Sequence, residues 1–457
     1  MRAVLLVSSA AALGGFLFGY DSAVINGAVG AIAVHFHAGS AALGLTVASA
    51  LLGAAVGALV AGRIADARGR LVPMRLAAVL FIISALGSGF AGSLLLLSAF
   101  RVIGGVAIGI ASVIAPTYIA EIAPAGMRGR LGSLQQLAIV TGIFVSLLVD
   151  YAIAAAAGSA QTPWWGGLDA WRWMFIAMIV PATLYGVCSF GIPESPRYLI
   201  AKARLPDARA VLTRMLGAAG VTAKIDQIAA SLKRDTPPDW SDLRGPAFGL
   251  LPIVWVGIGL SVFQQFVGIN VIFYYSSVLW QAVGFSERDS LAITVITSIV
   301  NIATTFIAIA LIDRAGRRPL LLVGSAGMAL TLGVLAIVFA HAPLNAAHQP
   351  QLDGAAGLIA LLAANLFVVS FGMSWGPVVW VLLGEKFPNR IRAAALAVAA
   401  CAQWLANWAI TTSFPTLQNL GLGLAYGVYT AFAVLSFFFV LKCVQESNGR
   451  ELEEMTS

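Results

Sequence analysis

Side-chain amides lie inside strongly apolar stretches of this 457-residue chain, and seven of them are candidate ligands. An amide without a partner in hydrocarbon is costly, so this concentration predicts a polar cavity at membrane depth. Individual amides can instead bond a neighbouring helix. The seven are Gln136, Gln264, Gln265, Asn270, Asn301, Gln403 and Asn407.

Helical spacing predicts which of these side chains share a face. Gln265 and Asn270 are five residues apart and would diverge by about 140° on a regular helix. We therefore predict a break in the helix near Gly268, a feature typical of membrane binding sites. Three other pairs have i,i+4 spacing and share a face: Gln403 with Asn407, Asn270 with Tyr274, and Gly376 with Trp380.

Asp21 lies deep in the first apolar stretch, and Arg101 lies near the start of the fourth. A lone charge at membrane depth costs about 2.5–3.5 kcal/mol, so we predict that these two side chains pair. A movement that makes or breaks the pair would change the proton affinity of Asp21, which predicts a proton-coupling site. A structural ion pair without coupling stays open. Asp150, near one end of its apolar stretch, is interpreted as a surface or packing residue.

The residue types favour a small polyhydroxylated ligand over other chemistry. A pyranose presents hydroxyls around apolar C–H faces, so its site needs amides and an aromatic ring such as Trp380. Motifs of nucleotide-driven pumps and of hydrolases are absent, namely G-x-x-x-x-G-K-[ST], H-E-x-x-H and G-x-S-x-G. We expect no enzyme activity, no metal and no cofactor.

Composition predicts the elements that position these residues. The chain is 60% apolar and 10% charged, with a mean hydropathy of +0.90. A spanning helix needs about 20 apolar residues, so we predict an all-α membrane protein with twelve transmembrane helices. They cover residues 4–32, 41–62, 72–92, 95–120, 129–156, 172–192, 248–282, 290–312, 319–340, 357–384, 391–414 and 421–443.

Basic residues alternate along this pattern. Of the 27 Lys and Arg residues, only Arg101, Arg172 and Arg288 lie outside every second loop and the termini. This bias predicts that both termini are cytoplasmic in a cell membrane. The net charge of +7 is therefore explained by basic loops on one side of a lipid bilayer, and no nucleic acid is expected as a partner.

The two halves of the chain repeat one another. The pattern D-x-x-G-R occurs at 66–70 and again at 313–317. A hydrophilic stretch separates the halves and is predicted to form short amphipathic helices at the membrane surface. The predicted domains are a six-helix bundle (1–193), a cytoplasmic helical linker (194–246), a second six-helix bundle (247–444) and a cytoplasmic tail (445–457).

Charged pairs recur at matching places in the two halves, after the second, fourth, eighth and tenth spans. Carboxylate–guanidinium pairs between helix ends can close when one face of a transporter shuts and break when it opens. A solvated basic loop is the alternative for any one cluster. The gating candidates are Asp66, Arg70, Glu121, Arg128, Glu194, Arg197, Asp313, Arg317, Glu385 and Arg392.

The chain resembles the sugar porters of the major facilitator superfamily, especially the bacterial xylose–proton and galactose–proton symporters, with the animal facilitative glucose transporters more distant. The most specific motifs are PESPRYL (193–199) and QQFVGINVIFYY (264–275). Others are GGFLFGYDSAVINGA (14–28), GRIADARGR (62–70), RVIGGVAIG (101–109), PTYIAEIAPAGMRGR (116–130), DRAGRRPL (313–320), SWGPVVWVLLGEKFPNRIR (374–392) and AQWLAN (402–407).

The resemblance implies the major facilitator fold and roles for particular residues. Matching positions carry Asp at 21 in proton symporters and an uncharged residue in facilitators. Ile143 departs from the glutamine of xylose symporters, which leaves hexose and pentose open. Positions matching Gln136, Gln264, Gln265, Asn270, Trp380 and Gln403 contact sugar, and those matching Phe18, Asn301, Gly376 and Tyr274 line the site or its outer gate.

Taken together, the residues and the resemblance predict a monosaccharide–proton symporter that works by alternating access and acts as a monomer. A sugar uniporter of the same fold and a non-transporting sugar sensor stay open as alternatives. A drug–proton antiporter is disfavoured because its pocket would be apolar rather than rich in amides.

Overall fold

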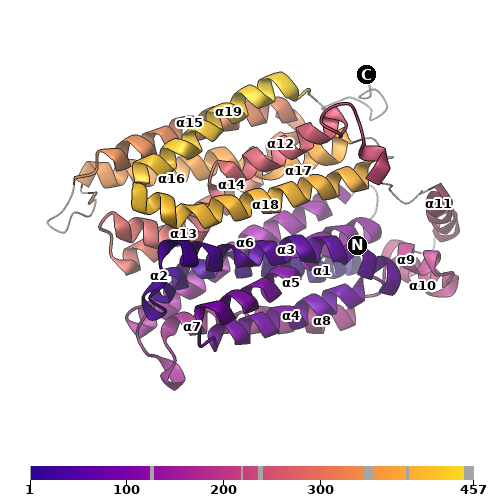
Figure 1. Cartoon of the computed structure of the whole chain (residues 1–457). Coiled ribbons are helices and arrows are strands. Elements are labelled where there is room, and N and C mark those ends of the chain that lie inside the picture. The colour runs from indigo at the N-terminus through magenta and orange to yellow at the C-terminus, as the bar shows by residue number, and fades with distance from the viewer. Residues whose placement is uncertain are drawn as a thin grey trace. The chain divides into compact units, whose positions relative to one another are not determined.

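The computed structural model describes residues 2–123, 128–217, 220–234, 240–343, 351–352, 354–387 and 391–446 (Figure 1). In these residues the extended elements are only two isolated bridges, Pro163 with Asp169 and Ala247 with Leu250. Twelve helical segments are long and apolar enough to cross a membrane. The predicted all-α class and the number of spans are therefore confirmed.

Most boundaries fall within a few residues of those predicted. The largest differences are in the second and eleventh spans, which were predicted to end at 62 and 414 but continue helically to Arg68 and Leu420. Backbone hydrogen bonding does not stop where the apolar stretch ends, so a helix can extend past the membrane.

Eight spans are formed by single helices, and four are each divided between two. The single helices are α3 (Ser40–Arg68), α4 (Leu71–Gly89), α5 (Leu94–Ile122), α6 (Arg128–Ala157), α14 (Glu287–Ala315), α15 (Arg317–Ala340), α18 (Arg392–Leu420) and α19 (Leu422–Cys443). The divided spans are α1 (Arg2–Ala23) with α2 (Ile25–His35), α7 (Ala170–Ala177) with α8 (Ile179–Gly191), α12 (Pro252–Phe266) with α13 (Ile269–Ala282), and α16 (Gly354–Gly372) with α17 (Trp375–Lys386).

The predicted break near Gly268 is confirmed. α12 ends at Phe266 and α13 begins at Ile269, with Gly268 between them at φ 83° and ψ 19°. This left-handed conformation strains a residue that has a Cβ, and glycine adopts it freely. A Cβ at Gly268 would also meet the ring of Tyr429 at 2.8 Å.

The linker forms three short helices, α9 (Pro196–Ala201), α10 (Leu205–Leu216) and α11 (Val221–Arg234). Their apolar faces meet in a small core that includes Leu199, Ala208, Leu212, Val221 and Ile225. The prediction of amphipathic helices in this stretch is confirmed. Short helices of 3₁₀ type occur at Trp165–Gly167 and Trp240–Leu243.

The chain packs as two compact units whose bounds differ from the predicted bundles. Unit 1 contains residues 1–22, 52–146 and 175–237, and within it α4 packs against α5 and α8. Unit 2 contains residues 23–51, 147–174 and 238–457, and within it α15 packs against α16 and α19 (Figure 1). The bundle boundaries themselves stay a prediction.

Candidate functional site

Three amides of unit 2 form a hydrogen-bonded chain across the break between α12 and α13. Asn270 Nδ2 donates to Gln265 Oε1 at 2.5 Å, and Gln265 Nε2 donates to Gln264 Oε1 at 3.3 Å. Gln264 Nε2 then donates to the carbonyls of Trp375 (2.8 Å) and Gly376 (3.2 Å) at the start of α17. The two divided spans are therefore linked by one polar chain.

The break at Gly268 is what brings these side chains together. Gln264 and Gln265 lie in the last turn of α12 and are buried, whereas Asn270 lies in the first turn of α13 and is half-buried. Each amide has one acceptor oxygen and two donor hydrogens. Within the described part of the chain, Asn270 Oδ1 accepts no hydrogen bond, so the chain ends on an acceptor that a ligand can use.

Two tryptophans of α17 have different surroundings. Trp375 is buried, and its Nε1 donates to the Leu321 carbonyl (3.1 Å) and lies 2.9 Å from Ser325 Oγ. Trp375 thus fixes the start of α17. Trp380 is 43% exposed, so its indole face is open to a ligand.

The other predicted residues of unit 2 lie on neighbouring helices. Asn301 of α14 and Tyr274 of α13 are buried. On α18, Asn407 is buried and its Oδ1 accepts from Thr411 Oγ1 at 3.1 Å, whereas Gln403 keeps a buried Oε1 that has no hydrogen-bond partner. Asn407 is therefore partly used by its own helix, and Gln403 retains an unused acceptor.

Unit 1 holds the predicted residues Phe18 and Gln136, both half-buried, and one that sequence reasoning missed. Gln135 is 8% exposed, and neither polar atom of its amide has a hydrogen-bond partner. A Cβ at Gly15 would meet this amide at 2.7 Å, so the glycine makes room for it. The doublet Gln135-Gln136 matches Gln264-Gln265 in type, which was a usable signal.

The predicted pair between Asp21 and Arg101 is confirmed. Arg101 NH1 lies 3.3 Å from Asp21 Oδ1 and donates to the Asp21 carbonyl at 2.8 Å. Both side chains are almost fully buried, and Asp21 Oδ2 has no hydrogen-bond partner. The pair therefore leaves one carboxylate oxygen available to a proton.

The charged residues after the second and fourth spans meet at the ends of α3 and α5. Arg70 donates two hydrogen bonds to Glu121, at 2.8 and 3.0 Å, and lies 3.5 Å from Asp66. Glu194 accepts from the backbone N–H groups of Arg70 (2.9 Å) and Leu71 (3.3 Å). Four of the gating candidates are thus brought together. Arg197 also has an interaction partner.

The second half repeats this arrangement with a residue that sequence reasoning missed, Glu446. Arg317 NH1 donates to the Ile312 carbonyl at 3.2 Å, as Arg70 NH1 does to the Ala65 carbonyl at 3.1 Å. Glu446 accepts from the backbone N–H groups of Arg317 and Arg318, both at 3.0 Å. The signal was the similarity of V-Q-E-S (444–447) to I-P-E-S (192–195). The side chains of Arg128, Asp313, Glu385 and Arg392 lie outside the described residues.

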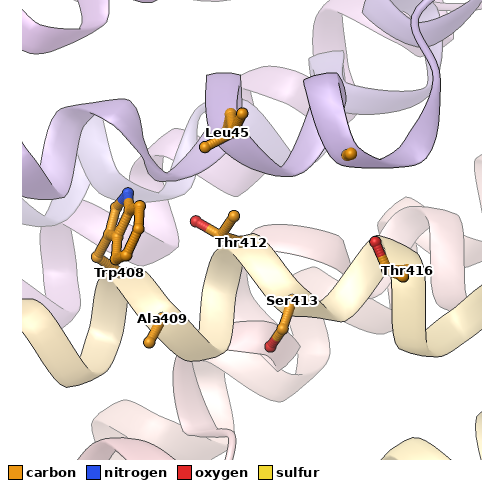
Figure 2. A pocket seen from close by; sticks show the side chains of 7 residues that line it. Leu45, Trp408, Ala409, Thr412, Ser413 and Thr416 are labelled. Carbon is orange, nitrogen blue, oxygen red and sulfur yellow. The ribbon is translucent and has the colours of Figure 1, made fainter.

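A cavity of about 450 Å³ lies between α3 and α18 in unit 2 (Figure 2). Trp408 and Thr412 of α18 point toward α3, which carries Leu45 (Figure 2). Its lining is mostly apolar and contains none of the predicted site residues, so it is separate from the amide chain. The described residues contain no group of three or more His, Cys, Asp or Glu side chains that could hold a metal ion.

Comparison with known proteins gives one consistent answer. Residues 7–457 match the family described as "Sugar (and other) transporter". The chain is 58% identical to a glucose transport protein of Synechocystis, over 100% of this chain and 97% of that one. It is 38% identical to a D-xylose-proton symporter of Escherichia coli K12, over 98% of this chain and 94% of that one.

The solved structures agree. The xylose transporter of E. coli in an inward-open conformation superposes with a TM-score of 0.84 at 36% identity, covering 99% of both chains. This match confirms the predicted major facilitator fold.

Proposed function

The chain belongs to the sugar transporter family, and on that basis we propose that it imports a monosaccharide together with a proton by alternating access. The observation that carries this proposal is the amide chain at the Gly268 break, which ends on the unused acceptor of Asn270. The glucose and xylose proteins named above support a hexose or a pentose as the substrate.

In this proposal the amides bind the sugar hydroxyls and Trp380 stacks on an apolar face of the ring. The hydrogen bonds that run from Asn270 through Gln265 to Gln264 orient each amide, so the groups facing the sugar are fixed before it binds. Preorganised polar groups lose less conformational entropy when a ligand arrives. Within unit 2 the proposed sugar contacts also include Gln403, Asn407, Asn301, Tyr274 and Gly376, and those proposed for unit 1 are Gln136 and Phe18.

The buried pair between Asp21 and Arg101 is the proposed coupling device. With Arg101 engaged at a single carboxylate oxygen, movement of α1 against α5 can release the carboxylate to take up a proton. Moving one charge through 100 mV yields about 2.3 kcal/mol, which can sustain a sugar gradient of about 50-fold. A uniporter would gain nothing from burying this pair.

The remaining parts of the proposal concern the molecule as a whole. The basic loops support cytoplasmic termini and a plasma-membrane location. Arg70, Glu121 and Glu194 are proposed to hold the cytoplasmic ends of α3, α4 and α5 when that face is closed. We propose that one chain is the working unit, because each half supplies its own polar groups.

The experiment is uptake of labelled glucose, xylose and galactose into vesicles, with and without an imposed proton gradient. We expect Asp21→Asn to lose gradient-driven accumulation while sugar exchange at equilibrium continues. Asp207→Asn, an exposed carboxylate of the linker, is the matched control and should behave as the parent. If the parent protein only equilibrates each sugar and ignores the proton gradient, it is a uniporter and the coupling proposal is wrong.

A further inference from the structure

Asp150 of α6 is a buried carboxylate that the proposed mechanism does not use. It is 0% exposed, so of the two interpretations, surface residue or packing residue, the first is wrong. Its Oδ2 accepts one hydrogen bond from the backbone N–H of Gly27 at 3.2 Å, and its Oδ1 has no hydrogen-bond partner among the described residues. A charged carboxylate buried with one neutral donor is costly, and the protonated form costs much less.

The partner of Asp150 lies beside a contact between two divided spans. Gly27 is in the first turn of α2, and a Cβ there would meet the Asp150 carboxyl at 2.7 Å. The preceding residue, Asn26, is bonded to α13: its Nδ2 donates to the Phe273 carbonyl (3.0 Å) and its Oδ1 accepts from the Ser277 N–H (3.2 Å). Ser277 Oγ also donates to the Asn26 carbonyl at 2.5 Å.

The charged and titratable groups near this contact belong to other pairs. On α2, His35 lies 3.1 Å from Asp169 and 3.1 Å from Arg172. On α6, the neighbouring Tyr151 is in a side-chain hydrogen bond with Arg288 of α14.

From α13 the titratable side chains are Tyr274 and Tyr275, and Tyr275 donates to the Thr411 carbonyl at 3.1 Å. Among the described residues, no Lys, Arg or His forms an ion pair with Asp150. A proton is therefore the cation that this site can take.

We propose that Asp150 is a second proton-binding site, separate from Asp21, and that its proton stabilises the contact between α2 and α13. This inference rests on the alternating access proposed above, because the contact must open for sugar to pass between α2 and α13. The neutral carboxyl lets Gly27 keep its hydrogen bond to Asp150 and lets Asn26 keep its bonds to α13. The ionised carboxylate is better accommodated when water reaches it, so higher pH favours the open contact.

Accessibility of Val278 measures this equilibrium directly. Val278 of α13 is half-buried and lies 3.7 Å from where a Cβ on Gly30 of α2 would be, so it is partly covered while the two helices pack together. We would introduce Val278→Cys after replacing the three native cysteines with alanine. A membrane-impermeant maleimide is then applied to intact cells from about pH 5.5 to about pH 8.5.

The same labelling is done with Asp150→Asn, whose amide has the shape of the protonated carboxyl. Dividing one rate by the other at each pH cancels the pH dependence of the thiol itself. At about pH 5.5 we expect equal rates, and at about pH 8.5 we expect the Asn protein to label about tenfold more slowly. A ratio that does not change with pH overturns the proposal.

A second variant tests the link if Asp150→Asn does not reach the membrane. Asn26→Ala removes both side-chain bonds to α13, keeps the backbone carbonyl that accepts from Ser277 Oγ, and leaves Asp150 in place, so Val278→Cys should label faster than in the parent in acid. Labelling that stays slow in acid would show that Asn26 does not connect Asp150 to α13. The labelling assay contains no sugar. If labelling depends on pH as expected but sugar uptake fails, the result counts against the proposed substrate and not against the Asp150 site.

Discussion

At the scale of single residues, the division of hydrogen bonds decides which amides can hold a ligand. Gln264 donates hydrogen bonds to the carbonyls of Trp375 and Gly376, so it positions α17 as well as facing the site. Asn270 donates one hydrogen bond to Gln265 and keeps its acceptor oxygen for a ligand. Asn270 is therefore the residue whose loss should affect sugar most directly while altering the helices least.

We predict that Asn270→Ala weakens sugar binding by about 1 kcal/mol or more, or about fivefold in the dissociation constant. The effect comes from losing both its own acceptor and its hold on Gln265. Binding of labelled sugar to purified protein measures it. Asn365→Ala is the matched control, since Asn365 Nδ2 bonds only the carbonyl of Leu361 within α16. Equal effects of the two substitutions would contradict the assignment.

At the scale of elements, interruption of a span places polar residues that a continuous helix would separate. Gln265 and Asn270 would point apart on a regular helix, yet they bond at 2.5 Å across Gly268. The α1–α2 and α16–α17 interruptions lie beside Asp21 and Trp375 in the same way. The amide chain and Asp21 therefore lie at helix ends, where backbone groups are also available.

Gly268→Ala should destabilise the protein by about 1–2 kcal/mol from backbone strain alone, with a further cost from contact with Tyr429. We expect a lower melting temperature and a loss of sugar binding. The measurement is thermal unfolding in detergent with and without sugar. Gly427→Ala on α19 is the control, because a Cβ there meets nothing within 4 Å. Unchanged sugar binding in Gly268→Ala would show that the break does not position the amides.

At the scale of the whole molecule, the two halves close one end of their helices with the same device. In each half an arginine donates to the carbonyl five residues earlier, and a glutamate after the last span accepts from backbone N–H groups at the start of the third. Each glutamate satisfies donors that a helix start leaves unpaired. In the first half, Arg70 also makes a paired contact to a second carboxylate, Glu121.

Arg70→Lys keeps the charge but cannot form both bonds to Glu121. We therefore expect proton-driven uptake to fall by about fivefold to tenfold, from loss of about 1–1.4 kcal/mol of charge-assisted hydrogen bonding. Initial uptake rates at matched protein level provide the measurement. The exposed Arg68→Lys is the control. Parent-like uptake in Arg70→Lys would argue against a gating role for the network.

Local patterns in the sequence were enough to predict the class of the molecule and much of its chemistry. Apolar stretches of about 20 residues can only be spanning helices, and the five-residue spacing of Gln265 and Asn270 required a break at Gly268. Charge in hydrocarbon needs a partner, so the two apolar stretches that hold Asp21 and Arg101 were enough to predict that these residues pair. These inferences succeed because each depends on local geometry or on the cost of leaving a polar group unsatisfied.

The folded chain was needed to show which polar groups are already used and which remain. It pairs Glu121 with Arg70, places Glu446 over the start of α15, and leaves Gln135 buried without a partner. It also buries Asp150 against Gly27, although the sequence placed this carboxylate near the end of a span. The physical reason is that partners and burial depend on contacts between residues far apart in the chain, and periodicity along one helix carries no record of those contacts.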